Sequence, residues 1–219
     1  GAAFETTTGS INTAIGYYAL YDNTVGQYNT AIGGEALADN TTANHNVAIG
    51  YQALRVNTTG IQNVAVGNFA LDASNANNNT AVGYLALSAN TTGAENTAVG
   101  YAALDANTDG HSNTAFGRSS LSANTSGDYN TALGMYALLN ATTADNNTAV
   151  GYAALVSSTT GYSNVAIGKD ASYSLTTGYY NTVIGHQAMN NGTTYVRCSA
   201  LGFQTLYNNT ANDNTGLGF

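Results

Sequence analysis

The amino-acid sequence predicts an all-β fold, a single-stranded parallel β-solenoid (β-roll) of about 13 coils with a 17-residue repeat. The phrase INTAIGYYAL at residues 11–20 returns almost unchanged as HNVAIGYQAL, ENTAVGYAAL and NNTAVGYAAL. A glycine interrupts each copy, which leaves the apolar half too short for a helix. Asn, Thr, Ala and Gly dominate the composition, and charged residues make up 7%, against roughly 25% in typical soluble domains.

The repeat is located by the asparagine that opens each phrase. Successive copies are 17 residues apart except for two steps of 16, from Asn63 to Asn79 and from Cys198 to Asn214. Both shorter steps lose their residue in the Asn/Thr/Gly half, which indicates that this half is loop and the apolar half is packed wall. The opening positions are Asn12, Asn29, Asn46, Asn63, Asn79, Asn96, Asn113, Asn130, Asn147, Asn164, Asn181, Cys198 and Asn214.

Each repeat predicts two short strands and a turn. In the first full repeat, a strand at residues 13–15 ends at Gly16, which can take a positive φ and turn the chain. A second short strand is expected around residues 18–20, and the N-T-T-G segment then returns the chain through turn residues. We expect one solenoid domain over residues 1–219, with partial coils at 1–11 and 214–219.

Stacked coils place identical residues above one another. The leucines at Leu20, Leu37, Leu54 and their later equivalents are expected to fill the coil interior. Asparagines stacked on asparagines are expected to hydrogen-bond along the stack. The branched residues that begin with Ile15 and Ile32 are expected to line one face of the first strand.

The alanine beside each branched residue predicts an assembly face. Neighbouring strand residues point to opposite sides, yet both of these positions are apolar in nearly every repeat. A lone solenoid with a wet outer wall should alternate apolar and polar residues, so we expect a partner to pack closely against the alanines. These are Ala14, Ala31, Ala48, Ala65, Ala81, Ala98, Ala115, Ala132, Ala149 and Ala166.

An aromatic position follows the turn glycine in several repeats. We interpret it as a candidate surface ladder, made of Tyr17, Tyr51, Tyr84, Tyr101 and Tyr152. Such rings could stack on sugars, but a packed aromatic ladder at a subunit edge is the favoured interpretation.

No catalytic, metal or cofactor site is predicted. His45, His111 and His186 fall at unrelated repeat positions, and Cys198 replaces a repeat asparagine without an evident histidine partner. The acidic residues show no calcium-binding spacing. The net charge of −8 and the pI of about 4.3 argue against nucleic acid as a partner, and no apolar run is long enough to span a membrane.

The phrases HNVAIGYQAL, SNVAIGKDAS and INTAIGYYAL resemble the head repeats of YadA-like trimeric autotransporter adhesins. They resemble even more closely the N-T-A-V-G-Y-x-A-L repeats of bacteriophage tail-fibre-like and related secreted bacterial proteins. The resemblance implies a left-handed β-roll, three chains side by side, and a location outside the cell, on its surface or on a virion. The chain begins at Gly1 without a signal peptide, so we expect a processed chain or a segment of a longer one.

These patterns predict a non-enzymatic extracellular rod, the shaft or head of a trimeric adhesin or phage tail fibre. A subunit that polymerises head to tail into a filament is the alternative, and the chain itself is the expected partner in both cases. Recognition of a host-surface receptor or glycan by the loop side is a further hypothesis. Ice binding is less favoured, because the loop threonines are adjacent and because the strand threonines lie beside residues expected to be buried.

Overall fold

The computed structural model describes residues 1–2 and 7–219, which divide into two compact units, residues 1–110 and residues 111–219. Residues 3–6 of the expected partial coil at 1–11 lie outside the described part. Unit 1 contains β1 (Thr13–Ile15), β2 (Thr30–Ile32), β3 (Val47–Ile49), β4 (Val64–Val66), β5 (Thr80–Val82) and β6 (Thr97–Val99). Unit 2 contains β7 (Thr114–Phe116), β8 (Thr131–Leu133), β9 (Thr148–Val150), β10 (Val165–Ile167), β11 (Thr182–Ile184), β12 (Ser199–Leu201) and β13 (Thr215–Leu217).

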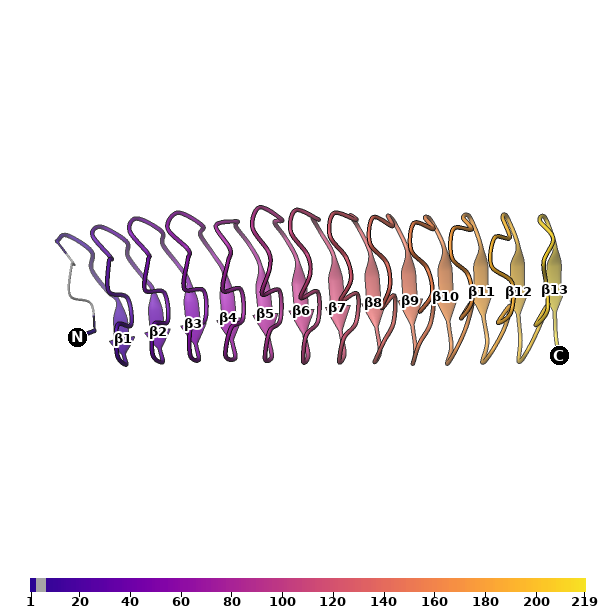
Figure 1. Cartoon of the computed structure of the whole chain (residues 1–219), viewed down its shortest axis with the longest axis horizontal. Helices are drawn as coiled ribbons and strands as arrows, with labels where there is room; N and C mark the ends of the chain where they lie inside the picture. Colours follow the sequence, from indigo (N-terminus) through magenta and orange to yellow (C-terminus); the bar gives the residue numbers. More distant parts are fainter. Residues whose placement is uncertain (3–6) are drawn as a thin grey trace. The chain divides into compact units, whose positions relative to one another are not determined.

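Within each unit the strands pair in parallel and in sequence order, one strand to a coil (Figure 1). Thr13 pairs with Thr30, Ala14 with Ala31 and Ile15 with Ile32, and the same register continues from coil to coil. The shorter coil after Asn63 keeps it, because Val64 still pairs with Thr80. The predicted parallel β-solenoid is therefore confirmed, and the one-residue deletion is absorbed in the loop half of the coil.

The second strand predicted for each coil is wrong. Residues 17–22 form turns instead, in which Tyr18 and Leu20 take left-handed φ values of 54° and 52°. Hydrogen bonds between coils nevertheless continue through this segment, since the Leu20 N–H donates to the Ala36 carbonyl at 2.9 Å. Left-handed residues bend the chain tightly around the leucine, and this bend closes a coil of only 17 residues.

The interior is formed by the predicted leucines and by two columns of asparagine. Leu20, Leu37 and Leu54 are fully buried. The opening asparagines bond through backbone and side chain together: the Asn46 N–H donates to Asn29 Oδ1 at 3.0 Å, and Asn46 Nδ2 donates to the Gly60 carbonyl at 2.8 Å. The expected hydrogen bonding along the stack is confirmed. In unit 1, the side-chain oxygen of each such asparagine accepts from the backbone N–H of the opening asparagine in the next coil.

A second column consists of the turn asparagines Asn23, Asn40, Asn57, Asn90, Asn107 and Asn124, all fully buried. Asn40 Nδ2 donates to Asn23 Oδ1 at 2.7 Å and Asn107 Nδ2 donates to Asn90 Oδ1 at 2.8 Å. Each side chain also reaches the carbonyl three residues ahead, as Asn57 does to Gly60 at 2.9 Å. These asparagines therefore hold the N-T-T-G turn closed and join it to the neighbouring coil.

Replacing the turn glycine Gly33 by alanine should destabilise unit 1. Gly33 has a φ of 135°, and a Cβ there would press against the carbonyl oxygen of Gly50. We expect the free energy of unfolding, measured by chemical denaturation, to fall by about 2 kcal/mol or more. Gly34→Ala is the matched control, because the added Cβ would meet the Tyr51 ring at 3.3 Å and the Tyr17 carbonyl oxygen at 3.9 Å, with no contact as close as the one at Gly33. Equal losses for the two variants would contradict this account of the turn.

Asn79→Ala tests the opening column. Asn79 donates to the Gly93 carbonyl at 3.0 Å and accepts from the Asn96 N–H at 2.9 Å. Without the Asn79 side chain the Asn96 N–H would lose this bond in the interior, whereas the Gly93 carbonyl would keep its bond from Asn90. A loss of about 1–3 kcal/mol in unfolding free energy is expected. Asn77→Ala, two residues earlier, removes one exposed bond to the Ile61 N–H and should cost under about 1 kcal/mol. If Asn79→Ala left the free energy of unfolding unchanged, the asparagine column would not be a source of stability.

Candidate functional site

The outer face of the strands is a continuous uncharged surface in each unit. The first and third residues of each strand are half-buried or exposed, whereas the middle residue points inward, as the burial patterns of β2 and β3 show. Ile15 is 60% and Phe116 58% exposed. We call the third residues the outward stripe; it consists of Ile15, Ile32, Ile49, Val66, Val82 and Val99 in unit 1, and Phe116, Leu133, Val150, Ile167, Ile184, Leu201 and Leu217 in unit 2.

The structure corrects the assembly face predicted at the alanines. Ala31, Ala48, Ala65, Ala81, Ala98, Ala115, Ala132, Ala149 and Ala166 are completely buried inside their own coils, and Ala14 in the first coil is half-buried. The nine completely buried alanines offer no surface to a partner. The apolar surface available for assembly is instead the outward stripe, on the opposite side of the same strands.

The reason for this reversal is the width of the coil. Leucine and asparagine side chains already fill the interior, so the inward side of the strand has room for a methyl group but rarely for more. Val183 in β11 is the larger exception, and it too is fully buried. The larger branched residues therefore lie on the outer side of the strand, because they are too large for the inner side. Alternation along the strand alone could not show which of the two apolar positions faces inward.

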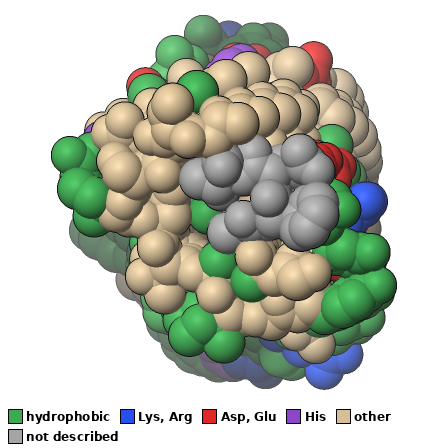
Figure 2. All heavy atoms as spheres, turned by 90° about the vertical axis from the view of Figure 1, so that its left-hand side faces the viewer, with side chains coloured by type: hydrophobic (Ala, Val, Ile, Leu, Met, Phe, Trp, Pro, Cys, Tyr) green, Lys and Arg blue, Asp and Glu red, His purple; other side chains and the backbone are tan. Residues whose placement is uncertain are grey.

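The first strand residues lie beside the stripe on the same outer face. Most are threonines, such as Thr30 and Thr97, and they are half-buried. No strand residue carries a charge. In Figure 2, which looks onto the left-hand end of Figure 1, hydrophobic side chains gather in several groups on the visible surface. The unit 2 face is hollowed at its last strands, where Ile184, Leu201 and Leu217 line an apolar depression.

The aromatic ladder is exposed as predicted, with Tyr17 at 66%, Tyr101 at 51%, and Tyr51, Tyr84 and Tyr152 at 44–45% exposure. Two of its members contact each other along the stack. Tyr84 and Tyr101 lie 5.6 Å apart and nearly parallel, and Phe69 joins the series edge-on to Tyr51. Tyr84 and Tyr101 cover one face of each other in this stacked pair. This arrangement favours a packed edge over a sugar-stacking platform.

The histidines and the other potential metal ligands of the described residues do not cluster. Within residues 1–2 and 7–219 no three His, Cys, Asp or Glu side chains are placed to hold a metal ion. The His45 ring stacks on Tyr28 at 4.9 Å, the His111 N–H donates to Asp128 at 2.6 Å, and the His186 ring lies 5.3 Å from Phe203. The three histidines are thus dispersed along the chain. In the part of the chain that the structure describes, no helix is long and apolar enough to cross a membrane.

Cys198 lies in the interior at an irregular coil. Its thiol is 3.4 Å from the Ala211 carbonyl, and its N–H still donates to Asn181 Oδ1 at 2.9 Å. Nearby, the buried Tyr195 hydroxyl donates to the Met189 carbonyl at 3.0 Å, and burial raises the pKa of Tyr195. This cysteine replaces the usual asparagine in the column and is shielded from solvent.

Comparisons with models of protein families, with curated proteins and with solved structures gave no match. The fold itself defines the class: the chain is a β-solenoid repeat protein, and the residues of β1–β13 that form its outer strand face carry no charge.

Proposed function

We propose that this chain is a non-enzymatic structural or adhesive solenoid that associates with further copies of itself, as the shaft or head of an extracellular fibre. The observation that supports this function is the outward stripe. It recurs in every coil and has no charged residue within the strands. Contiguous apolar surface of this kind is uncommon on monomeric proteins beyond a few hundred Å² and is typical of interaction sites.

A second copy of the chain is the partner that fits this face best. The stripe repeats once per coil, at the spacing of about 4.8 Å between neighbouring strands. Only a partner with the same spacing can match it over many coils, and another copy has that spacing by construction. Burying the branched side chains would also gain about 25 cal/mol for each Å² of apolar surface removed from water.

The number of chains in the assembly can be determined by measuring its mass. The resemblance to trimeric adhesin heads favours three parallel chains around the stripe, which gives three times the chain mass of 22.4 kDa. Head-to-tail filaments are the alternative and would give a mass that grows with concentration. Sedimentation equilibrium separates the two, and a monomer at all concentrations would contradict self-association.

Ile49→Lys tests the stripe as the interface. Ile49 is 37% exposed, so a lysine there is tolerated by the single chain but would bury a charge in the assembly. We expect the assembled mass to fall to that of the monomer while the circular dichroism spectrum is kept. Thr59→Lys adds the same charge to the exposed loop side of the same coil and should leave assembly intact. Assembly of both variants would exclude this face. Ala98→Lys is unsuitable, because Ala98 is buried and the change would disrupt the coil.

Ice binding is a second candidate function, because the structure places the strand threonines outward. Thr13, Thr30, Thr80 and Thr97 flank the stripe of unit 1 on the outer face, and Val47 and Val64 take the same position in the two coils between them. A flat array of threonine and branched methyl groups is the surface expected for that function.

Thermal hysteresis distinguishes the two functions, since both would use the same face. If copies of the chain cover it, the wild-type protein should show no thermal hysteresis in a freezing-point measurement. Hysteresis that Ile49→Lys abolishes and Thr59→Lys preserves would instead establish ice binding and displace self-assembly as the function.

A further inference from the structure

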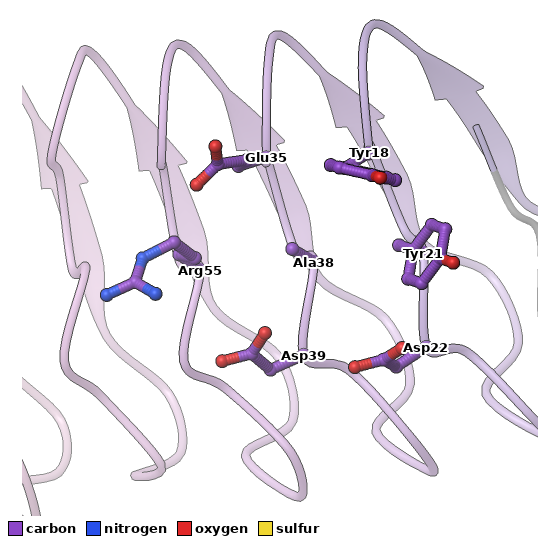
Figure 3. Close-up of a pocket in the computed structure, with 7 residues that line it drawn as sticks. All are labelled: Tyr18, Tyr21, Asp22, Glu35, Ala38, Asp39 and Arg55. Atoms are coloured by element: carbon purple, nitrogen blue, oxygen red, sulfur yellow. The ribbon is translucent and has the colours of Figure 1, made fainter. Parts of the chain in front are cut away.

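A hollow lies on unit 1 away from the outward stripe. Three successive coils place Tyr21, Ala38 and Arg55 at the same position, directly after the buried leucine. Because alanine is much smaller than its two neighbours, a hollow with a volume of about 210 Å³ opens over it (Figure 3). The step in side-chain size along one column therefore creates a concave site on an otherwise regular surface.

One wall of the hollow is aromatic. The rings of Tyr18 and Tyr21 lie 4.5 Å apart and almost perpendicular, at 79°. Figure 3 shows both rings on the same side of Ala38, from the coil that precedes it. Tyrosine faces attract cations within about 6 Å of the ring centre, and two rings at right angles present differently oriented π surfaces to one small group.

The rim of the hollow is acidic. Asp22 and Asp39 project along one edge from adjacent coils, and Glu35 lies on the other (Figure 3). Of the seven described lining residues, only Arg55 is cationic, and its Nε donates to Asp72 at 3.2 Å. The carboxylates therefore exceed the positive charge available to balance them within the hollow.

The pKa of Asp39 is raised in this hollow, mainly by burial. Burial raises the pKa of Asp39, and the negative charges of Asp22, Asp72 and Glu35 raise it further, whereas Arg55 lowers it. A bound cation would stabilise the ionised carboxylate and oppose the rise in pKa. Ligand affinity should accordingly decrease as the pH falls through the pKa of Asp39.

We propose that this hollow binds an organic cation, an alkylammonium group of the kind that choline and the lysine side chain carry. Its methylene or methyl groups would occupy the space over Ala38 against Tyr18 and Tyr21, and its charge would face Asp22 and Asp39. An apolar wall with a few convergent polar groups is the general form of a small-ligand site. The site is separate from the self-assembly proposed above and does not depend on it.

Choline and 3,3-dimethyl-1-butanol form the decisive pair, because they have the same shape and differ in charge. We expect choline to bind the full chain with a dissociation constant on the order of 1 mM, measured by isothermal titration calorimetry. The neutral analogue should bind at least about tenfold more weakly, which corresponds to the loss of about 1.4 kcal/mol. Equal binding of the two, or no saturable binding of choline, would overturn the proposal.

Ala38→Leu locates the site. Leucine would fill the hollow, and Ala38 has no positive φ that would make the change strained. Choline binding should be lost, and Asp39→Asn should weaken it about tenfold. Ser88→Leu is the matched control, since it makes a similar addition at the same coil position away from the hollow. Choline binding unchanged in Ala38→Leu would show that the ligand lies elsewhere and refute the site.

Two further arms identify the source of the ammonium group. Nα-acetyl-lysine amide represents a protein side chain, and phosphatidylcholine vesicles represent a lipid headgroup. Sedimentation equilibrium of Ala38→Leu should match that of the wild type, because the hollow is not part of the stripe. If the wild-type protein assembles but does not bind choline, only the proposed site is refuted. If the wild-type protein binds choline but remains a monomer, only the proposed self-assembly is refuted.

Discussion

Hydrogen bonding between successive coils is the constraint on which the rest of this structure depends. Each coil can stack only if its backbone groups meet those of the next, so every position along the 17-residue path must suit the same position one coil away. The strand Thr30 N–H donates to the Asn46 carbonyl at 2.8 Å, and the turn Leu37 N–H donates to the Ala53 carbonyl at 3.1 Å. The repeated phrase in the sequence is the direct consequence, because a residue that fits one coil fits all of them.

Much of the fold could be predicted from spacing alone. The position of the strands, the turn glycines, the buried leucines and the asparagine column all follow from which residues recur and at what interval. The direction of Ala31 and Ile32 could not be derived in that way, since alternation separates the two sides of a strand without showing which is inside. Comparing side-chain sizes with the small interior of a short coil would have resolved the question.

The turns at residues 17–22, where a second strand was predicted, could not be foreseen for another reason. The x-A-L segment has the apolar content of a short strand, but its left-handed residues Tyr18 and Leu20 are of types that sequence statistics assign to other conformations. The backbone accepts these φ values because coil closure and bonding between coils compensate for the local strain. The hollow over Ala38 could not be predicted from any single repeat, because it depends on three residues in adjacent coils, which become neighbours only when the repeats are aligned by position.

The two candidate surfaces occupy different positions around the coil. The outward stripe belongs to the strand, whereas the hollow lies after the buried leucine, so occupation of one leaves the other accessible. The two surfaces also differ in that the outward stripe repeats from coil to coil and the hollow over Ala38 does not. A surface that repeats from coil to coil suits a partner that repeats, and a hollow formed by three particular coils suits a single small group.

The buried turn asparagines have a consequence for covalent modification. Asn40, Asn57, Asn90 and Asn124 each begin an N-x-[ST] triplet and would be read as acceptors for N-linked sugars. In the folded coil their amide groups are fully enclosed and bonded to the turn. An oligosaccharide could reach them only on an unfolded chain, and once attached it would prevent the coil from closing. Folding and glycosylation at these positions are therefore mutually exclusive.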